Sequence, residues 1–409
     1  MRFYFFSYFK KIKSKEQLTY FYHNPTMGQV ILVNLRFCTL ELFFMSKLAL
    51  FFVLILLTFS SCKNSSKSQK DLQDELSEHQ LLIEKPKDIA TPEGMVWVEG
   101  KTFMQGAKQG DEHALPREHP AHQVTVDGFF IDVTEVTNKQ FKAFVDATNY
   151  ITLAERPIDW EEMKQDLPEG TPKPADSILQ PGRLIFNKNV NIVDNMNNYS
   201  QWWIWKIGAN WKHPEGPKST IEGKDDYPVV HIAYEDAMAY CKWANRRSPT
   251  EAEWESAAQG NDTKDIYTWG NDPAQLNASA NTWQFTFPLK NESTYGFELI
   301  APVKSYPPNS IGLYDMLGNV WELTSDWFNV DTYKQLDISK PLINPKGADH
   351  TYTPNNPYAK EHVIKGGSFL CHASYCASFR ISARMGTSWD SGSDHSGFRT
   401  VATVEMLKE

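Results

Sequence analysis

From about residue 91 onward, glycine, proline, asparagine and tryptophan interrupt the chain too often for long helices or long strands. The whole chain has 22 Gly, 23 Pro and 13 Trp among its 409 residues. An aromatic content of 13% is too high for a disordered polypeptide, and the irregular spacing does not fit a regular β-sandwich. These features predict an α+β fold with much irregular structure, in which long packed loops connect short elements.

Capping signals and apolar periodicity predict three helices. Thr137 with Gln140, and Thr250 with Glu253, each form a capping box at a helix start. Residues 234–246 carry apolar side chains at helical spacing. Short apolar runs predict strands at residues 95–98, 123–130, 229–232, 301–305 and 362–366.

The N-terminal region carries a targeting signal that begins at Met45. A basic residue is followed by ten apolar residues, 48–57, and then by small residues before Cys62. The apolar run is shorter than the roughly 20 residues that span a bilayer, and the pattern is typical of a lipoprotein signal peptide. We predict that residues 45–61 are the signal peptide, that Cys62 carries the lipid, and that residues 62–90 form a flexible tether. The protein would then be membrane-anchored and face the periplasm, on the inner or the outer membrane.

Residues 1–44 do not fit upstream of a signal peptide, because aromatic and basic side chains mix there without a helical or strand period. We predict that this segment is a spurious extension and that Met45 is the true start. The formal net charge of the chain is −9, and this acidic balance argues against a nucleic-acid partner.

Two of the five cysteines, Cys371 and Cys376, lie close together in the segment GGSFLCHASYC, residues 366–376. Their spacing fits neither a CxxC redox turn nor a paired zinc knuckle. Two thiolates suit a disulfide in an exported protein, and they also suit a soft, low-coordinate ion such as Cu(I). The spacing alone leaves both interpretations open.

The chain resembles the formylglycine-generating enzyme family, also called the sulfatase-modifying factor family, over about residues 91–405. The segments that carry the resemblance are VDGFFID (126–132), GANWKHPEGP (208–217), PTEAEWE (249–255), GLYDMLGNVWE (312–322), GGSFLCHASYC (366–376) and SGFR (396–399). With the lipoprotein signal, the chain is similar to a bacterial lipoprotein member of this family. The resemblance implies a fold related to C-type lectin-like domains.

The resemblance also implies an activity. The family consists of copper-dependent oxidases that use O2 and a thiol reductant. They convert a cysteine in a Cys-x-Pro-x-Arg type motif of sulfatases to Cα-formylglycine, and the substrate here would be an unfolded segment of an exported sulfatase.

Matching positions assign roles to several residues of this chain. Cys371 and Cys376 would hold Cu(I). The other residues that match the reaction site are Ser368, Tyr375 and Trp321. The residues that match substrate-binding positions are Arg384 and His395. Cys241 stands at a family disulfide position whose partner is absent here, so we expect a buried free thiol.

Two calcium sites are implied in the same way, each built from hard oxygen ligands. The first matches Asp315, Gly318, Val320 and Glu322. The second matches Asn281, Thr282 and Phe297. Tyr295 stands where the family has an acidic ligand in the second site, so that site lacks a carboxylate.

Alternatives of other functional classes stay open. One is a non-catalytic lipoprotein of the same fold that acts in gliding or secretion machinery, although the members of that class lack the cysteine pair. Another is a lectin-like binding module, which rests on fold analogy alone. An iron-dependent sulfoxide synthase needs an additional helical bundle with iron-binding histidines, and residues 63–90 are too short to supply one.

Overall fold

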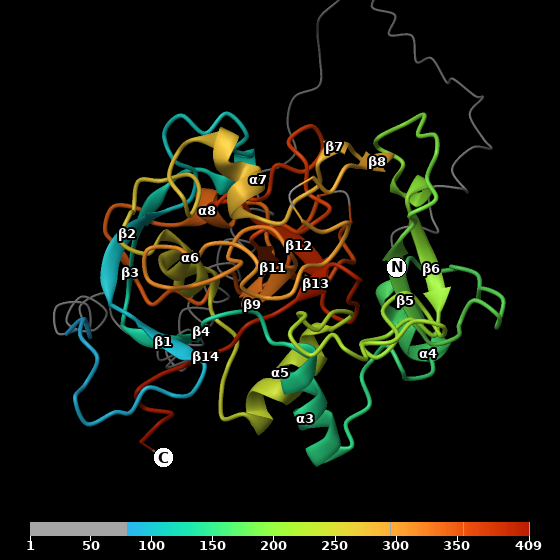
Figure 1. Cartoon of the computed structure of the whole chain (residues 1–409), viewed down its shortest axis with the longest axis horizontal. Helices are drawn as coiled ribbons and strands as arrows, with labels where there is room; N and C mark the ends of the chain where they lie inside the picture. Colours follow the sequence, from blue (N-terminus) through green and yellow to red (C-terminus); the bar gives the residue numbers. More distant parts are fainter. Residues whose placement is uncertain (1–79, 295, 355, 409) are drawn as a thin grey trace, which may run out of the picture. The chain divides into compact units, whose positions relative to one another are not determined.

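The computed structural model describes residues 80–294, 296–354 and 356–408. In this part the chain has a mixed α+β fold with much irregular structure (Figure 1), as the sequence predicts. The helices are α3 (Asn138–Thr148), α4 (Trp160–Met163), α5 (Tyr234–Trp243), α6 (Glu251–Gln259), α7 (Leu276–Ser279) and α8 (Thr332–Gln335). None of the helices in these ranges is both long enough and apolar enough to cross a membrane.

The strands are short and form several small sheets. Their bounds are β1 (Met95–Val98), β2 (Lys101–Gln105), β3 (His122–Val126), β4 (Phe129–Asp132), β5 (Gly182–Phe186), β6 (Trp203–Ile207), β7 (Phe285–Thr286), β8 (Lys290–Asn291), β9 (Trp321–Trp327), β10 (Leu342–Ile343), β11 (Glu361–Lys365), β12 (Met385–Ser388), β13 (Ser396–Gly397) and β14 (Val401–Ala402). The four-stranded sheet has the order β12-β11-β9-β13, and the three-stranded sheets have the orders β1-β4-β14 and β10-β3-β2. Two hairpins, β5-β6 and β7-β8, complete the set.

Helix α6 lies between two of these sheets (Figure 1). It contacts β2 and β3 on one side and β9 and β11 on the other. Trp254 of α6 is fully buried between them. The four-stranded sheet is therefore held on a rigid base, and the loops at its ends carry the site described below.

The predicted helix starts are confirmed. In α3 the Thr137 side chain accepts from the Gln140 N–H, and Gln140 Oε1 accepts from the Thr137 N–H at 2.8 Å. Thr250 and Glu253 form the same reciprocal pair at the start of α6. Helix α5 ends at Trp243, earlier than predicted, because Asn245 adopts a left-handed conformation with φ of 51°.

The strand predictions are correct only in part. Strands β1 and β11 form where expected, but the run 123–130 divides into β3 and β4. A Cβ at Gly128 would lie 2.1 Å from the Trp97 ring, so the chain turns there in a space that admits only glycine. Residues 229–232 and 301–305 are not strands, because His231 and Lys304 have φ of 65° and 66° and interrupt any ladder.

The folded part begins before the predicted boundary at residue 91. The Leu82 carbonyl accepts from the Gly128 N–H at 2.6 Å, and Ile89 is buried against Met95 and Phe130. Residues 80–90, assigned above to the tether, therefore pack on the domain. The predicted extension, the signal peptide, Cys62 and the first part of the tether lie outside the described residues.

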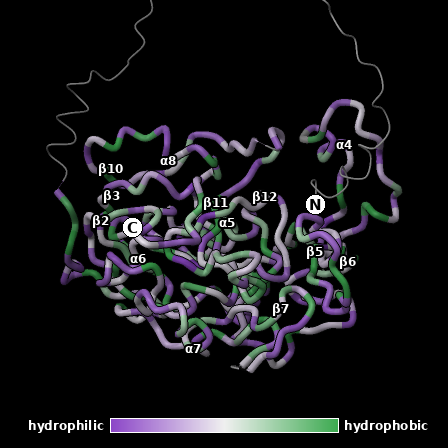
Figure 2. The backbone as a smooth tube through the Cα atoms, turned by 90° about the horizontal axis from the view of Figure 1, so that it is seen from above, coloured by the Kyte–Doolittle hydropathy of each residue, from purple (hydrophilic) through white to green (hydrophobic). Residues whose placement is uncertain are grey.

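The apolar core consists of a large cluster and a smaller one. The large cluster contains aromatic side chains from α3, α5 and the C-terminal segment, such as Phe141, Tyr240 and Phe398. The smaller cluster joins residues 186–202 to residues 283–287 and to Phe369 and Leu370. Figure 2 shows hydrophobic segments concentrated toward the middle of the domain, with more hydrophilic loops around them. The smaller cluster supports the cysteine-bearing loop.

Candidate functional site: a pocket with two cysteines

The loop that follows β11 turns tightly because of two glycines. Gly366 and Gly367 have φ of 87° and 77°. A Cβ at Gly366 would lie 2.7 Å from the Met316 carbonyl oxygen, and a Cβ at Gly367 would lie 3.0 Å from the Phe379 nitrogen. Only glycine fits this conformation and this close approach, which explains the Gly-Gly pair in the sequence.

Two further turns bring the cysteine side chains together. The Cys371 N–H donates to the Ser368 carbonyl at 2.9 Å, and the Cys376 N–H donates to the His372 carbonyl at 2.8 Å. The two Sγ atoms then lie 2.7 Å apart, and both cysteines are free thiols. Two converging soft donors fit a low-coordinate Cu(I) ion. They also remain close enough to form a disulfide.

The two thiols differ in acidity. A hydrogen bond from the Cys371 thiol, followed by hydrogen bonds from Ser378 and the positive charge of Arg117, lowers the pKa of Cys376 to about 7. Burial raises the pKa of Cys371. Near neutral pH the pair therefore holds one proton between two sulfurs, with the negative charge favoured on Cys376. Within the described ranges, no group of three or more His, Cys, Asp or Glu side chains is arranged to hold a metal ion.

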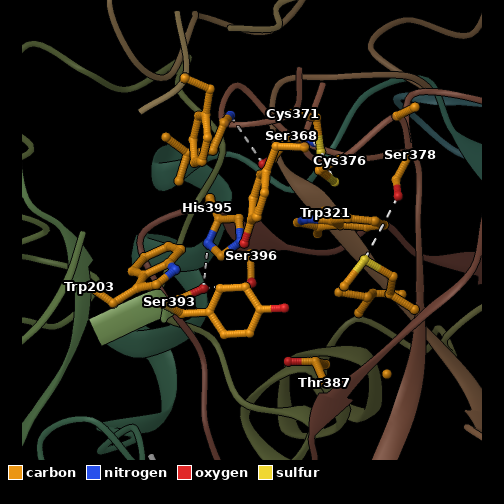
Figure 3. A pocket seen from close by; sticks show the side chains of 18 of the residues that line it. Trp203, Trp321, Ser368, Cys371, Cys376, Ser378, Thr387, Ser393, His395 and Ser396 are labelled. Atoms are coloured by element: carbon orange, nitrogen blue, oxygen red, sulfur yellow. Dashed lines mark hydrogen bonds between the residues drawn. The ribbon is translucent and has the colours of Figure 1, made fainter. Parts of the chain in front are cut away.

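A pocket of about 640 Å³ opens in front of the cysteine pair. Cys371, Cys376 and Ser368 lie at one side of it, with the Trp321 ring beneath them (Figure 3). Tyr375 also lines it. All five residues predicted to belong to the reaction site therefore line one pocket, although Trp321 lies in β9 and the others lie in the loop after β11. Their catalytic roles stay predictions.

Aromatic side chains form one wall of the pocket. The Tyr375 ring stacks on Phe287 with centroids 4.5 Å apart, and it meets Trp202 edge-on at 5.6 Å. Trp203 packs against His395 at 4.9 Å. The wall therefore offers stacking and apolar surface to a bound chain. Sequence reasoning missed Trp202, Trp203 and Phe287, because their distance along the chain from Cys371 gives no local signal.

A polar strip faces this aromatic wall. His395 Nδ1 lies 2.7 Å from Ser393 Oγ, and Ser393 Oγ lies 2.8 Å from Ser396 Oγ. Burial lowers the pKa of His395 to about 3, with a smaller effect from His231. The imidazole is therefore neutral at pH 7 and serves as a hydrogen-bonding group. Figure 3 shows His395, Ser393 and Trp203 across the pocket from the cysteines, consistent with the predicted place of His395 at a substrate.

Charged side chains occupy another part of the pocket lining, and sequence reasoning missed them. Arg380 is paired with Glu118 and Asp111, with N–O distances of 2.7 and 2.6 Å. Arg117 and Glu361 line the same pocket. The Glu361 Oε2 accepts from the Thr353 hydroxyl at 2.6 Å, and burial raises the pKa of Glu361. No motif in the sequence connects these residues to the cysteine pair.

Arg384 requires a correction. The expectation that it binds substrate is wrong, because its side chain is 1% exposed and absent from the pocket lining. Its Nε and Nη2 donate to both oxygens of Glu251 at 2.8 and 2.9 Å, and its Nη1 donates to the Asn329 carbonyl at 3.1 Å. It is a structural arginine whose backbone carbonyl accepts from Arg117 Nε at 2.7 Å.

The first predicted calcium site lies in a buried cluster of carboxylates. Glu322 accepts from Arg399 at 2.6 Å through each oxygen, and its Oε2 also accepts from Trp254 Nε1 at 2.7 Å. Asp315 and Glu135 add two carboxylates, so three acids face one arginine. Burial raises the pKa of Asp315 to about 6, and burial together with the charges of Asp315 and Glu322 raises the pKa of Glu135.

One carboxylate oxygen of this cluster has no partner. Glu135 is fully buried, and within the described residues its Oε2 makes no hydrogen bond. An excess of buried carboxylate with an unpaired oxygen fits a hard cation such as Ca²⁺. Glu135 was not among the predicted ligands. The predicted ligand Glu322 is instead engaged on both oxygens by Arg399. The backbone ligands Gly318 and Val320 lie between Asp315 and Glu322 in the chain.

The second predicted calcium site fits less well. The Asn281 amide donates to the Leu299 carbonyl at 2.8 Å and to Asn319 Oδ1 at 3.1 Å. Thr282 Oγ1 is buried and has no partner in the described part of the chain. Phe297 is half-buried. No carboxylate is among the hydrogen-bond partners that the described residues give to Asn281 and Thr282, so the donor set here is weak for Ca²⁺.

Cys241 is buried and free, as expected. Burial raises the pKa of its thiol above the ordinary range. It packs in the large core cluster and not at the pocket.

These features define a protein of the formylglycine-generating-enzyme fold with a paired-cysteine pocket, and comparison with known proteins agrees. Residues 80–404 match the family described as "Sulfatase-modifying factor enzyme 1-like domain". The formylglycine-generating enzyme of Thermomonospora curvata is 39% identical over 319 residues, which cover 78% of this chain and 95% of that protein. The chain belongs to the sulfatase-modifying factor family.

Two further comparisons bear on fold and activity. The solved structure of PvdO from Pseudomonas aeruginosa matches with a TM-score of 0.51 and 20% identity, covering 78% of this chain and all of that one. This likeness shows the fold. A mouse protein named "Inactive C-alpha-formylglycine-generating enzyme 2" is 35% identical over 318 residues, covering 77% of this chain and 87% of that protein. Membership in the family therefore does not by itself establish catalysis.

Proposed function

We propose that this protein is a copper-dependent oxidase that converts a cysteine of an exported sulfatase to Cα-formylglycine. The substrate is an unfolded segment with a Cys-x-Pro-x-Arg type motif, O2 is the oxidant and a thiol supplies the reducing equivalents. The observation that carries the proposal is the convergence of the Cys371 and Cys376 sulfurs, 2.7 Å apart, on the wall of a pocket of about 640 Å³. Relatives named formylglycine-generating enzyme support the same reaction.

The reaction replaces a thiol-bearing CH2 group with an aldehyde. The substrate loses its sulfur and two hydrogens and gains one oxygen, and O2 accepts the electrons. When bound by Cys371 and Cys376, Cu(I) supplies a soft centre that takes thiolates and reacts with O2. The chain's own residues hold, orient and enclose the reacting groups.

Each pocket residue has a physical task in this proposal. The Ser368 N–H donates to Cys371 Sγ at 3.4 Å and fixes that sulfur. Trp321 is almost fully buried beneath the cysteines and keeps water from that side. Tyr375, stacked on Phe287, offers an aromatic face along the bound segment. His395, neutral and fixed by Ser393, offers a ring nitrogen to the backbone of the substrate.

We further propose a structural Ca²⁺ ion in the cluster of Asp315, Glu135 and Glu322. Glu135 supplies the unpaired oxygen, and the backbone carbonyls of Gly318 and Val320 complete the set. A second ion at Asn281, Thr282 and Phe297 would bind more weakly, since it lacks a carboxylate. Calcium here stabilises the segment that supports the cysteine loop and takes no part in the reaction.

The proposed setting is a lipid anchor at Cys62 with the domain facing the periplasm. The sequence pattern of residues 45–62 supports it. Sulfatases exported as unfolded chains would pass this location before they fold, which suits a pocket that takes an extended segment.

The alternative is a non-catalytic member of the family that acts as a structural or binding module. The inactive mouse relative gives this alternative its support. Turnover distinguishes the two functions, whereas the fold is common to both.

The test is a turnover assay on the domain from residue 80 onward, reduced and reconstituted with Cu(I). A peptide with a Cys-x-Pro-x-Arg motif is incubated under air with a thiol, and the aldehyde is captured with a hydrazide. We expect aldehyde from the wild type and none from Cys371→Ser or Cys376→Ser. Cys241→Ala is the matched control, because this thiol lies outside the pocket and its loss should preserve turnover. Absence of aldehyde from a folded, copper-loaded wild type would favour the non-catalytic alternative.

A further inference from the structure

The pocket lining contains two arginines whose charges are used differently. Arg380 donates to Glu118 through both Nη atoms, to Asp111 at 2.6 Å and to the Ala377 carbonyl at 2.7 Å. All of its nitrogens are thereby engaged within the protein. Its positive charge is offset by two carboxylates and is not free to act on a ligand.

Arg117 is held differently. Its Nε donates to the Arg384 carbonyl at 2.7 Å, and its guanidinium lies 6.0 Å from the centre of the Phe328 ring. Within the described residues, neither Nη atom of Arg117 has a hydrogen-bond partner. The stem is thus anchored from outside the reaction site, while the donor end of a pocket-lining guanidinium stays unpaired.

The Arg117 charge reaches the cysteine pair. It is close enough to act on Cys376 electrostatically, and Cys376 acts on it in return. Figure 3 shows that Cys376 lies at the pocket side of the pair and is not shielded behind Cys371. A cation with free N–H groups therefore stands at the place where negative charge would gather.

The amount of that charge follows from the proposed chemistry. A Cu(I) ion held by two thiolates has a net charge of −1, and a substrate thiolate brings it to −2. In a partly water-excluded pocket this second negative charge is costly unless a cation lies nearby. Arg117 is the pocket cation whose donors are unpaired in the described structure, and the pocket carboxylate Glu361 opposes the binding of an anion.

We propose that Arg117 is a positioning residue that selects the substrate as a thiolate by offsetting the negative charge it adds to the Cys371–Cys376 pair. The inference rests on the proposed function. It assigns no contact with O2 and no proton transfer to Arg117. In binding, the substrate S–H loses its proton to solvent, and the sulfur stays in the pocket as an anion beside the guanidinium.

The experiment measures equilibrium binding without turnover. The Cu(I)-loaded domain is titrated anaerobically with a Cys-x-Pro-x-Arg peptide and with the same peptide carrying serine in place of cysteine. The variants are Arg117→Gln and Arg117→Lys. Because Glu361 and the rest of the pocket are unchanged, the ratio of the two affinities isolates the thiolate. Arg156→Gln is the control, since Arg156 pairs with Glu235 and neither lines the pocket.

We expect Arg117→Gln to weaken binding of the cysteine peptide on the order of tenfold and to leave the serine peptide unchanged. Arg117→Lys should restore most of the difference, and Arg156→Gln should match the wild type. If Arg117→Gln does not fold, Arg117→Met, which keeps an unbranched stem over Phe328, carries the same comparison.

Two results would overturn the inference. Equal weakening of both peptides would mean that Arg117 only shapes the pocket, and no weakening of either would mean that its charge does not reach the thiolate. A failure of the proposed function looks different. In that case the wild type itself would bind the cysteine and serine peptides with the same affinity, and the inference would fall with it.

Discussion

The amide N–H of Phe369 donates a 2.8 Å hydrogen bond to the carbonyl of Asn319. This bond fastens the cysteine-bearing loop to the segment between Asp315 and Glu322. The Gly318 N–H donates to the Gly366 carbonyl at 2.9 Å and strengthens the same junction. The loop that would hold copper and the segment that would hold calcium are thus joined through the backbone.

Loss of the Asn319 side chain should disturb both sites. Its Oδ1 accepts from Asn281 and from the Ala301 N–H at 2.9 Å, and its Nδ2 donates to Glu135 at 3.0 Å. Asn319→Ala leaves these buried groups unpaired, at roughly 1–3 kcal/mol for each group. We expect a lower free energy of unfolding by denaturant and a weaker Cu(I) affinity in competition with a chelator. Asn344→Ala, at an exposed turn, should leave Cu(I) affinity unchanged. Unaltered copper affinity in a destabilised Asn319→Ala would contradict the coupling.

Calcium should stabilise the protein more at pH 7.5 than at pH 5. Burial raises the pKa of Asp315 to about 6, above the value of an unfolded aspartate. Its favourable contribution in the absence of metal is therefore present at low pH and is lost as pH rises through about 6. Ca²⁺ binds the ionised carboxylates and offsets this loss. We expect a rise in Tm on the order of 5 °C with saturating Ca²⁺ at pH 7.5 and little at pH 5.

The control for this experiment is the buried oxygen itself. Glu135→Gln should remove most of the calcium-dependent rise in Tm, whereas Asp337→Asn, at a fully exposed position, should keep it. An equal shift at both pH values, or an undiminished shift in Glu135→Gln, would rule out the proposed cation site.

The apo cysteine pair should react selectively with iodoacetamide. The pKa of Cys376 is lowered to about 7, chiefly by the hydrogen bond from Cys371, and the thiolate is the nucleophile. Peptide mass spectrometry should therefore show modification of Cys376 that rises with pH around a midpoint near 7. The midpoint should move upward in Cys371→Ala, while the buried Cys241 stays unmodified. A midpoint at or above about 8.5, the value of an ordinary thiol, would show that the pair does not share a proton in this way.

The Glu322–Arg399 pair should dominate stability in this part of the core. Both side chains are essentially unexposed. Glu322→Gln leaves a buried arginine without its counter-charge, which costs roughly 3–5 kcal/mol. Asp146→Asn, which breaks the exposed pair with Lys142, should cost less than about 1 kcal/mol. Urea unfolding in the presence of EDTA measures both, and similar losses in the two variants would contradict the ranking.

The parts of the fold that sequence could predict are those determined by neighbours along the chain. Capping boxes at Thr137 and Thr250 fix helix starts within a few residues, and both are present. Strand 229–232 fails as a prediction because its apolar residues are buried by tertiary packing with no partner ladder, and His231 has a positive φ. Burial and extended pairing leave the same apolar signature in a short run.

The candidate site divides in the same way. The cysteine pair and its neighbours Ser368 and Tyr375 lie in one segment, so motif and resemblance locate them. Arg117 reaches the pocket from more than 250 positions earlier in the chain, and nothing in its local sequence marks it. Arg384 shows the opposite error, since a matching arginine is a buried partner of Glu251.

The central claim is that Cys371 and Cys376 act together as one copper centre that oxidises a substrate cysteine. The most direct measurement is the yield of aldehyde from the Cys-x-Pro-x-Arg peptide as Cu(I) is added in steps to the reduced domain under air. We predict that the initial rate rises linearly and breaks at one equivalent of Cu(I), and that it stays at zero in Cys371→Ser and Cys376→Ser. Aldehyde formation without copper or without either cysteine would contradict this account, as would complete binding of one equivalent without any aldehyde.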